Sequence, residues 1–319
     1  MKKIGILTSG GDGPGMNAAI RSVVRYALNY DLEVVGIMRG YQGLLDDDIV
    51  PMNHRSVSNI INKGGTILKT ARSKEFSTDE GKMKAAEVLR RNAIDALIVV
   101  GGDGSYRGAN RLYELTGIPT IGLPGTIDND LNGTDQTIGC STAVNTALES
   151  IDKIRDTAQS MERIFVVEVM GNKSGYIAME VALAAGAEDV IIPERPFDYN
   201  AMYDEAREGN AKGKISWIIV TAEGAAKAQT VAENITTAIG LETRYAVLGH
   251  VQRGGTPSGQ DRILSTRLGA AAVDLLLNGI YGKAVGVLQD KINVVDLKDA
   301  TRRIHEDMDR RYQLLKILT

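Results

Sequence analysis

Residues 122–137, GLPGTIDNDLNGTDQT, contain the side chains of this sequence that are best suited to chemistry. Thr126, Asp128 and Asp130 occupy alternate positions after a glycine-flanked turn. Side chains alternate with a period of two in an extended chain, so this spacing predicts that all three face one spot. A hydroxyl and two carboxylates there suit phosphoryl transfer to an alcohol, with Asp128 orienting the hydroxyl and accepting its proton. Considered singly, Asp128 and Asp130 fit an Asx turn equally well.

Two glycine-rich loops predict a phosphate site. TSGGDGPGMNAA (residues 8–19) and GGDGSYRGA (residues 101–109) each follow an apolar run and open a helical pattern. Glycines let the backbone approach an anion closely, and the N–H groups of a helix N-terminus point toward it. Neither loop fits GxxxxGK[ST] or GxGxxG, which argues against an ordinary P-loop or dinucleotide site. The alternative is that these glycines only permit tight turns.

The same loops carry the candidate metal ligand. Asp12 and Asp103 each lie in one of them, and a carboxylate beside an anion is unfavourable unless a cation is present. An aspartate without a lysine suits Mg2+, which binds a carboxylate together with water and phosphate oxygens. We therefore predict a nucleotide site with Mg2+ on Asp103. Arg72, in TILKTARS, is the candidate cation beside the transferring group, and a surface salt bridge is its alternative role.

Basic residues in the second half indicate an anionic acceptor. Arg163 precedes IFVVEV, Arg244 precedes YAVLG, and His250 and Arg253 follow that run in GHVQRGG. Forked guanidinium donors at strand ends suit a sugar phosphate. Glu223, after WIIVTA, can accept hydrogen bonds from sugar hydroxyls. Taken one by one, the arginines fit ordinary solvated charges.

The elements that must position these residues alternate along almost the whole chain. Short apolar, β-branched runs alternate with amphipathic stretches, which predicts an α/β fold with mainly parallel sheets. The predicted strands are residues 4–9, 33–38, 96–100, 120–123, 164–169, 190–192, 217–221 and 245–249. The predicted helices include residues 17–28, 80–90, 142–157 and 261–277. Ligands of open parallel sheets bind beyond the carboxyl ends of the strands, so the candidate loops are expected to line one crevice.

Two Rossmann-like, three-layer α/β/α domains are expected. A stretch rich in Gly, Asp and Asn near residues 124–138 separates two series of βα units, and the helix after GHVQRGG is expected to return the chain to the first domain. We therefore assign residues 1–138 with about 254–305 to a nucleotide-binding domain. Residues 139–253 with the C-terminal tail are assigned to a sugar-phosphate domain.

Composition argues against several classes of function. The chain has 319 residues and a net charge of −3, so a basic face for nucleic acid is not expected. The N-terminus reaches glycines and an Asp too early for a secretory segment, and no apolar run approaches the ~20 residues of a membrane span. One cysteine, Cys140, and three scattered histidines argue against an internal disulfide or a zinc site. These features predict a soluble, cytoplasmic protein.

The segments TSGGDGPGMNAAIR, GGDGSYRGA, PGTIDND, MGN..G and GHVQRGG together resemble bacterial ATP-dependent 6-phosphofructokinases over almost the whole chain. The resemblance implies transfer of the ATP γ-phosphate to the 1-hydroxyl of fructose 6-phosphate, with Mg2+, in a two-domain homotetramer. By matching positions, it assigns these residues to ATP and its metal: Gly11, Arg72, Asp103, Gly104, Ser105 and Gly108. It assigns these to the acceptor, with Asp128 as the base: Thr126, Asp128, Asp130, Arg163, Met170, Gly171, Glu223, Arg244, His250 and Arg253. In this family, residues matching Arg163 and Arg244 come from a neighbouring subunit.

The sequence departs from the family pattern near the transferring phosphate. Members usually read MGR..GD where this chain reads MGNKSGY, so Asn172 replaces an arginine and Tyr176 an aspartate. Loss of such a cation weakens the stabilisation of transition-state charge by a few kcal/mol. Either Lys173 substitutes for the arginine, or the protein is a slow or regulatory paralogue that binds sugar phosphate and nucleotide.

Two other kinase classes are alternatives. A pyrophosphate-dependent phosphofructokinase shares the fold and the TIDND loop, but that class resembles GGDD at Gly104 and has a lysine at Gly125. Glycine at both positions leaves space for a nucleotide and favours ATP. NAD kinases share the GGDG loop, but they lack PGTIDND and GHVQRGG.

A second anion site, for an effector, is also expected. Arg21 and Arg25 lie one turn apart on a predicted helix and can face one anion, although a solvated helix face fits equally well. In the resembling family, matching arginines bind ADP or phosphoenolpyruvate between subunits. The resemblance adds His54, Arg155, Glu188, Lys212 and Lys214 to this site. His54 stands where an arginine is common and Ile215 where a lysine is common, so phosphoenolpyruvate inhibition is expected to be weak and to strengthen as His54 is protonated.

Overall fold

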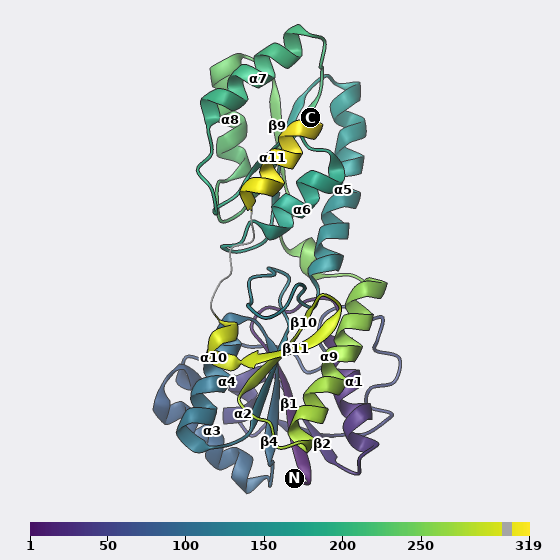
Figure 1. Ribbon diagram of the computed structural model, residues 1–319, viewed down its shortest axis with the longest axis vertical. Helices are drawn as coiled ribbons and strands as arrows, with labels where there is room; N and C mark the ends of the chain where they lie inside the picture. Colours follow the sequence, from purple (N-terminus) through teal and green to yellow (C-terminus); the bar gives the residue numbers. More distant parts are fainter. Residues whose placement is uncertain (302–307) are drawn as a thin grey trace. The chain divides into compact units, whose positions relative to one another are not determined.

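The computed structural model describes residues 1–301 and 308–319 (Figure 1). These residues divide into two compact units. Unit 1 comprises Met1–Thr142 and the described residues from Arg253 onward to Thr301, and unit 2 comprises Ala143–Gln252 and the described C-terminal residues from Met308. The predicted domain boundary near residue 305 lies outside the described residues, and the ligand assigned to each domain stays a prediction.

Unit 1 is built on one large sheet. Its described strands are β1 (Lys3–Ser9), β2 (Glu33–Ile37), β3 (Ile49–Met52), β4 (Ala96–Gly101), β5 (Thr120–Pro124), β10 (Lys283–Leu288) and β11 (Lys291–Asp296). They lie in the order β11-β10-β5-β4-β1-β2-β3. The two edge strands, β3 and β11, pair antiparallel to their neighbours, and the five central strands run parallel.

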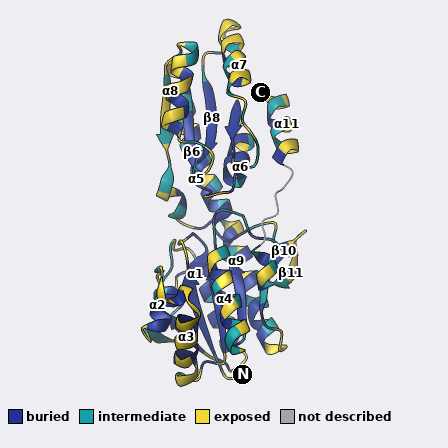
Figure 2. Ribbon diagram, turned by 90° about the vertical axis from the view of Figure 1, so that its left-hand side faces the viewer, coloured by how far each residue is buried: buried dark blue, intermediate teal, exposed yellow. Residues whose placement is uncertain are grey.

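Helices cover both faces of this sheet. One core joins the strands to α1 (Met16–Leu28) and α9 (Gly259–Leu277). The opposite core contains the apolar faces of α2 (Gly40–Leu45), α3 (Asp79–Arg91), α4 (Asp103–Thr116) and α10 (Leu297–Ala300), with the short η1 (Glu75–Ser77). Figure 2 shows the central strands buried between helices whose outer faces are exposed. Unit 1 is therefore a three-layer α/β/α structure.

Unit 2 contains a smaller sheet in which all four described strands are parallel. The order is β7 (Asp189–Ile191), β8 (Trp217–Ala222), β6 (Ile164–Val169) and β9 (Thr243–Val247). Residues of α7 (Tyr199–Ala211) and α8 (Ala228–Ile239) form a core with alternate residues of β6 and β8. Helix α6 (Tyr176–Ala185) packs on β8, and α11 (Met308–Leu318) packs on α6. Helix α5 (Cys140–Ser160) and the short η2 (Gly249–Arg253) include the residues at which the chain passes from one unit to the other.

The predicted fold class is confirmed, and each of the eight predicted strands is present. The strands β3, β10 and β11 were not predicted. Strand β3 has four residues and includes Pro51, which favours an edge position. The turn between β10 and β11 has positive φ at Gln289 (49°) and Asp290 (62°), and no glycine or asparagine signals it. No helix in the described residues is long and apolar enough to cross a membrane.

Candidate active site

The three predicted chemical loops of unit 1 leave the sheet side by side. Strand β4 lies between β1 and β5, with Ser9 opposite Gly101 and Gly101 opposite Pro124. The first glycine loop, the second glycine loop and the carboxylate loop therefore begin at one edge, where carboxyl ends of parallel strands place ligand sites. The sequence predicted this convergence from the alternation of strands and loops.

Close packing requires a glycine at position 101 of these loops. A side-chain carbon on Gly101 would lie 2.5 Å from both the Ser105 Oγ and the Ser9 carbonyl oxygen. A side-chain carbon on Gly102 would lie 3.5 Å from the Thr126 Cβ. These contacts bring the second glycine loop against both the first glycine loop and the carboxylate loop.

Gly104 and Gly108, both assigned to ATP, have different surroundings. At Gly104 the nearest atom to an added side-chain carbon is the Arg107 Nη2, 4.0 Å away, so a side chain there would extend into open space. At Gly108 the same carbon would lie 3.0 Å from the ring of Phe76 and 3.3 Å from that of Tyr41. These two rings stack 3.8 Å apart, so Gly108 lets α4 pack closely against them.

The carboxylate loop is a turn, and the prediction of an extended chain through it is wrong. Strand β5 ends at Pro124, and the Thr126 Oγ1 accepts a hydrogen bond of 3.2 Å from the N–H of Asp128. Asn129 has a φ of 48°, which interrupts the period-two alternation. Its Nδ2 donates to the Asp135 carbonyl at 3.0 Å, and its Oδ1 accepts from the N–H of Thr137 at 2.8 Å. The side-chain amide of Asn129 therefore holds the two sides of the loop together.

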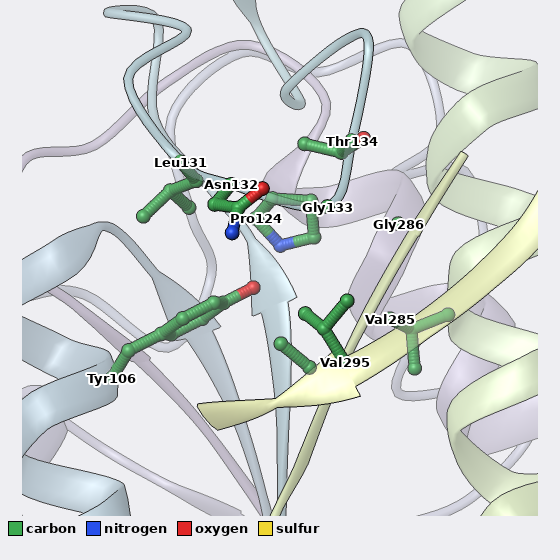
Figure 3. Close-up of a pocket in the computed structure, with 10 residues that line it drawn as sticks. Tyr106, Pro124, Leu131, Asn132, Gly133, Thr134, Val285, Gly286 and Val295 are labelled. Atoms are coloured by element: carbon green, nitrogen blue, oxygen red, sulfur yellow. The ribbon is translucent and has the colours of Figure 1, made fainter. Parts of the chain in front are cut away.

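The far side of the carboxylate loop rests on β10, β11 and α10. The Thr134 Oγ1 accepts from the N–H of Val287 at 3.1 Å, and the Asn132 N–H and Nδ2 donate to carbonyls of α10 at 3.0 and 3.2 Å. A narrow pocket behind the loop is lined by Pro124, Gly133 and Val295 among others, and the Tyr106 hydroxyl points into it (Figure 3). Tyr106 is 1% exposed, and its hydroxyl has no hydrogen-bond partner among the described residues. Burial raises the pKa of Tyr106.

Asp103 begins helix α4 and fits the role of a single magnesium ligand. Its carboxylate forms an ion pair of 2.8 Å with Arg107, one turn later on the same helix. The two side chains are 41% and 60% exposed, so the pair is weak and a metal can replace the arginine. The described residues contain no group of three His, Cys, Asp or Glu side chains that could hold a metal ion by themselves. One carboxylate completed by phosphate oxygens and water is the donor set that Mg2+ prefers. Arg72 is exposed, in the loop before η1.

The acceptor residues predicted in unit 2 fall into two groups. Met170, Gly171 and Glu223 lie at the carboxyl ends of β6 and β8, where the Glu223 Oε1 accepts from the N–H groups of Gly171 at 3.3 Å and Asn172 at 2.9 Å. His250 is exposed in η2. Sequence reasoning missed Gln252, which is fully buried and accepts from the N–H of Met170 at 2.8 Å.

Arg163 and Arg244 lie at the other end of the same sheet. Arg163 directly precedes β6, and Arg244 is the second residue of β9 and stands opposite Phe165. Glu242, which the sequence analysis did not single out, joins them. It pairs with the Arg163 Nη2 at 2.9 Å and with the Arg244 Nη2 at 2.5 Å.

Arg253 belongs to unit 1, unlike most of the predicted acceptor residues. A side-chain carbon on Gly11 would lie 2.8 Å from the Arg253 Cζ, so the guanidinium rests on the first glycine loop. The Arg253 Nε is buried and has no hydrogen-bond partner in the part of the chain that the structure describes.

The predicted effector residues are shared between the two units. Arg21 and Arg25 lie on α1 of unit 1, and His54 is exposed in the same unit. In unit 2 the Arg155 Nη2 donates to the carbonyls of Ala185 at 2.8 Å and Gly186 at 3.0 Å.

Glu188 and Lys214, two other members of this predicted set, form an ion pair of 3.2 Å, and the Lys214 ammonium lies 4.7 Å from the centre of the Trp217 ring. Lys212 ends α7 and pairs with Glu208 at 3.5 Å. Within unit 2 the structure therefore brings Glu188 and Lys214 into contact, whereas Lys212 is paired along its own helix.

A buried carboxylate fixes the helix entrances beside the loops of unit 1. Asp261, in the first turn of α9, is 1% exposed. It accepts hydrogen bonds from the N–H of Gly139 at 2.9 Å and from the N–H and Oγ1 of Thr142 at 2.8 and 2.5 Å. Burial raises the pKa of Asp261, and the hydrogen bonds that it accepts oppose this rise.

Comparisons with known proteins agree with this arrangement. Residues 3–276 match the family model "Phosphofructokinase". The chain is 52% identical over 312 residues to ATP-dependent 6-phosphofructokinase 1 of Thermus thermophilus, which covers 97% of each chain. It is 50% identical over 320 residues to ATP-dependent 6-phosphofructokinase of Oceanobacillus iheyensis, which covers 100% of each.

Solved structures give the same result for the fold. Phosphofructokinase from Saccharomyces cerevisiae matches with a TM-score of 0.88 and 37% identity over 94% of this chain, and this chain spans 45% of that one. A pyrophosphate-dependent phosphofructokinase from Marinobacter aquaeolei matches with a TM-score of 0.84 and 23% identity, over 99% of this chain and 91% of that one, and shows a shared fold alone. The chain belongs to the phosphofructokinase family.

Proposed function

We propose that this protein transfers the γ-phosphoryl group of ATP to the 1-hydroxyl of fructose 6-phosphate, giving fructose 1,6-bisphosphate and ADP in glycolysis. The identity of about half to ATP-dependent 6-phosphofructokinases over nearly the whole chain supports this activity. The structural observation that carries the proposal is the convergence of both glycine loops and the carboxylate loop at the carboxyl ends of β1, β4 and β5.

Asp128 is the proposed base, and its loop supports that role. Transfer breaks the bond between the γ-phosphorus and the β,γ-bridging oxygen of ATP, forms a bond from phosphorus to the sugar oxygen, and releases the hydroxyl proton. Asp128 orients the hydroxyl and takes this proton as the new bond forms. Thr126, whose Oγ1 accepts from the N–H of Asp128, fixes the turn. Arg72 is the proposed cation beside the transferring group.

The first two glycine loops are proposed to hold the nucleotide. Gly11, Gly104 and Ser105 line the edge where β1 and β4 end, and N–H groups at the start of α4 suit an anionic phosphate. When bound on Asp103, Mg2+ would neutralise charge on the phosphate oxygens.

We propose ATP and not pyrophosphate as the donor, and the argument for ATP rests on Gly104. A side chain at Gly104 meets open space, so an aspartate there would enter the solvent-facing side of the loop without disturbing packing. At Gly125 an added side-chain carbon would lie 2.7 Å from Val100 and 3.0 Å from the Gly101 nitrogen. Glycine at position 125 is thus required by the fold of this chain as well, and Gly104 carries the argument for a nucleotide.

We propose that the acceptor site is completed by residues of a neighbouring subunit. Arg163 and Arg244 lie at the amino ends of β6 and β9, whereas Met170 and Glu223 follow the carboxyl ends of β6 and β8. A strand of six residues spans roughly 20 Å, so these two groups of one chain cannot contact the same sugar-phosphate molecule. This supports a homotetramer in which the two arginines serve a neighbouring subunit, while Met170, Gly171, Glu223 and His250 serve their own.

A regulatory anion site is proposed between subunits, formed by Arg21, Arg25, His54, Arg155, Glu188, Lys212 and Lys214. The buried Arg25 Nε has no hydrogen-bond partner within the described ranges, which supports an anionic ligand there. Because His54 stands in place of a permanent cation, we propose weak inhibition by phosphoenolpyruvate that is stronger at pH 6 than at pH 8. Strong inhibition that is equal at both pH values in fructose 6-phosphate saturation curves would show that His54 does not limit the site.

The deciding experiment is a coupled assay of ADP formation with fructose 6-phosphate, MgATP and the purified protein. ATP-dependent turnover with pyrophosphate inactive as donor is the expected result. The second candidate is a slow or regulatory binding protein, which Asn172 favours because it leaves that position without a charge. Binding of both ligands without turnover in this assay would establish that candidate instead.

A further inference from the structure

Residues 63–72 end in Arg72, the proposed cation beside the transferring group, and they form neither helix nor strand. Arg72 has no ion pair within the described residues that would fix its side chain. Its position therefore depends on how the backbone before it is held. A side-chain carbon built on Gly65 would lie 3.8 Å from the Asp12 Oδ2, so this segment lies beside the first glycine loop.

Asn17, in the first turn of α1, holds the backbone of this segment at three points. Its side chain is 1% exposed. The Nδ2 donates to the carbonyls of Lys63 at 3.0 Å and Gly64 at 3.1 Å, and the Oδ1 accepts from the N–H of Ile67 at 2.8 Å. An amide offers both donors and an acceptor, whereas a leucine of similar shape offers neither and an aspartate offers no donor when ionised.

A buried threonine of β1 holds the end of the same segment. The Thr8 Oγ1 donates to the Lys69 carbonyl at 2.9 Å and lies 3.0 Å from the Thr66 Oγ1. Because a hydroxyl has one hydrogen, Thr66 is the donor of the second bond. The Thr66 Oγ1 also accepts from the N–H of Leu68 at 3.2 Å. The strand and the helix on either side of the first glycine loop thus both fix residues 63–69.

We propose that Asn17 is a positioning residue for phosphoryl transfer, which holds residues 63–69 against the first glycine loop and so places the guanidinium of Arg72 beside the transferring phosphoryl group. Asn17 takes no part in bond making and acts through Arg72. A misplacement of about 1 Å in such a group can cost ~10²-fold in rate, so the anchoring is expected to matter for kcat. This inference rests on the proposed function, because it requires Arg72 to act on the transferring group.

A double-mutant cycle in steady-state kinetics tests whether Asn17 acts through Arg72. Asn17→Leu is expected to lower kcat at least ~10-fold and Arg72→Ala ~10²-fold. Combined, they are expected to lower kcat no more than ~3-fold below Arg72→Ala alone, because the cation that Asn17 places is already gone. Ser22→Ala is the matched control, since Ser22 is buried on the same helix and donates to the Thr266 carbonyl at 2.6 Å, and it should keep the wild-type kcat. Unchanged kcat in Asn17→Leu, or a double variant that loses the full product of ~10³-fold, would overturn the proposal.

The threonine pair supplies a rescue by a conservative change. Thr66→Val keeps the shape and removes the bonds to Thr8 and Leu68, so it is expected to lower kcat at least ~3-fold by loosening the same segment. Thr66→Ser keeps the hydroxyl and is expected to stay within ~2-fold of the wild type. A loss of kcat in Thr66→Ser equal to that in Thr66→Val would contradict a role for these hydrogen bonds.

Limited trypsin digestion tests the anchoring without any activity, because trypsin cleaves after lysine and both Lys63 and Lys69 are exposed. Asn17→Leu is expected to speed cleavage at these two bonds ~10-fold relative to other sites, as measured by mass spectrometry, whereas Ser22→Ala should not. Unchanged cleavage at both bonds would overturn the anchoring role. If the wild type fails to phosphorylate fructose 6-phosphate, the proposed function fails, and the digestion still decides whether Asn17 holds residues 63–69. Asn17→Asp, which keeps only the acceptor, replaces Asn17→Leu in every measurement if the leucine variant does not fold.

Discussion

Asp128 is positioned by its neighbours in a turn. The Thr126 Oγ1 accepts a hydrogen bond from the N–H of Asp128. Asn129 has a left-handed backbone conformation, and its side-chain amide forms hydrogen bonds with the backbone of Asp135 and Thr137. The orientation of the proposed base therefore depends on hydrogen bonds from side chains to the backbone of residues nearby in the sequence.

Asp128→Asn is expected to lower kcat by at least ~10²-fold, because an amide cannot accept the hydroxyl proton. Binding of MgATP and fructose 6-phosphate should stay within a few-fold, since the carboxylate acts chiefly when the proton moves. Steady-state kinetics with ligand titrations measure both quantities. A variant that keeps more than about a tenth of the wild-type kcat would exclude Asp128 as the base.

Gly104→Asp is expected to raise the KM for ATP at least several-fold without loss of thermal stability. The new carboxylate would enter open space beside the nucleotide phosphates and repel them. Gly104→Ala is the matched control, since it adds a side chain without charge. Gly125→Lys should instead lower stability, because its first side-chain carbon would lie 2.7 Å from Val100. Unchanged ATP kinetics in Gly104→Asp would remove the reason for preferring ATP at this position.

At the scale of elements, buried polar groups connect the loops to the helices and strands behind them. Asp261 at the start of α9 accepts hydrogen bonds from Gly139 and Thr142, at and just before the start of α5. Tyr41 and Tyr106 are both buried on the opposite side of the large sheet, and the Tyr41 hydroxyl donates to the Ser105 carbonyl at 2.7 Å. Asp261 and the Tyr41 hydroxyl have hydrogen-bond partners, whereas the Tyr106 hydroxyl has none among the described residues. Removal of these polar groups is therefore expected to change stability in opposite directions.

Asp261→Asn is expected to reduce the free energy of unfolding by about 1–3 kcal/mol near pH 4, because an amide N–H2 would face the N–H donors of α5. Burial raises the pKa of Asp261 in the folded protein. A raised folded-state pKa means that the stabilisation is present below the ordinary aspartate pKa and is lost as the pH rises through the folded value. The gap between wild type and variant should therefore narrow from pH 4 toward pH 7 in urea denaturation. A gap that widens with pH would mean that the hydrogen bonds outweigh burial.

Tyr106→Phe is expected to leave the protein as stable as the wild type or more stable by about 1 kcal/mol, since it removes a buried hydroxyl without a partner and leaves the ring in place. Tyr41→Phe is the matched control and should lower the free energy of unfolding by about 1 kcal/mol, because it removes the hydrogen bond that the Tyr41 hydroxyl donates to the Ser105 carbonyl. Chemical denaturation of the two variants side by side measures the difference. Destabilisation of Tyr106→Phe equal to that of Tyr41→Phe would show that the Tyr106 hydroxyl is hydrogen-bonded.

At the scale of the whole molecule, strand direction separates residues that one molecule of sugar phosphate would need together. Arg163 and Arg244 are joined by Glu242 at the amino ends of β6 and β9, away from Met170 and Glu223. The parallel sheet makes this separation unavoidable within one chain, which is why a second subunit is proposed to complete the acceptor site.

Mixing two inactive variants tests this arrangement. Asp128→Asn and the double variant Arg163→Ala with Arg244→Ala are each expected to lose most activity as separate homo-oligomers. Co-refolded in equal amounts, they should regain about a quarter of the wild-type activity, because hybrid oligomers pair an intact Asp128 with intact arginines of a neighbour. Recovery no greater than the sum of the separate activities would show that each chain completes its own site.

The sequence by itself determined the strands that are covered on both faces and the loops that follow them. Continuous β-branched runs such as residues 96–100 have one favourable position, between two helical layers, and the glycines after them mark the carboxyl edge. Fold class, the shared edge of the three loops and the family could therefore be predicted from local patterns.

Only the tertiary structure decided features that depend on residues distant in sequence. Period-two alternation failed in the carboxylate loop, because Asn129 bonds to Asp135 and Thr137 and holds a left-handed backbone that spacing does not reveal. The β10–β11 hairpin escaped prediction because its turn, Gln289 and Asp290, has neither the glycine nor the asparagine that usually marks a two-residue hairpin. The contact of Arg253 with Gly11 joins segments more than 240 residues apart. Such contacts arise from packing between layers, and local sequence patterns do not report them. Hydrophobic periodicity, in contrast, involves neighbouring residues of one element and can be recognised in the sequence.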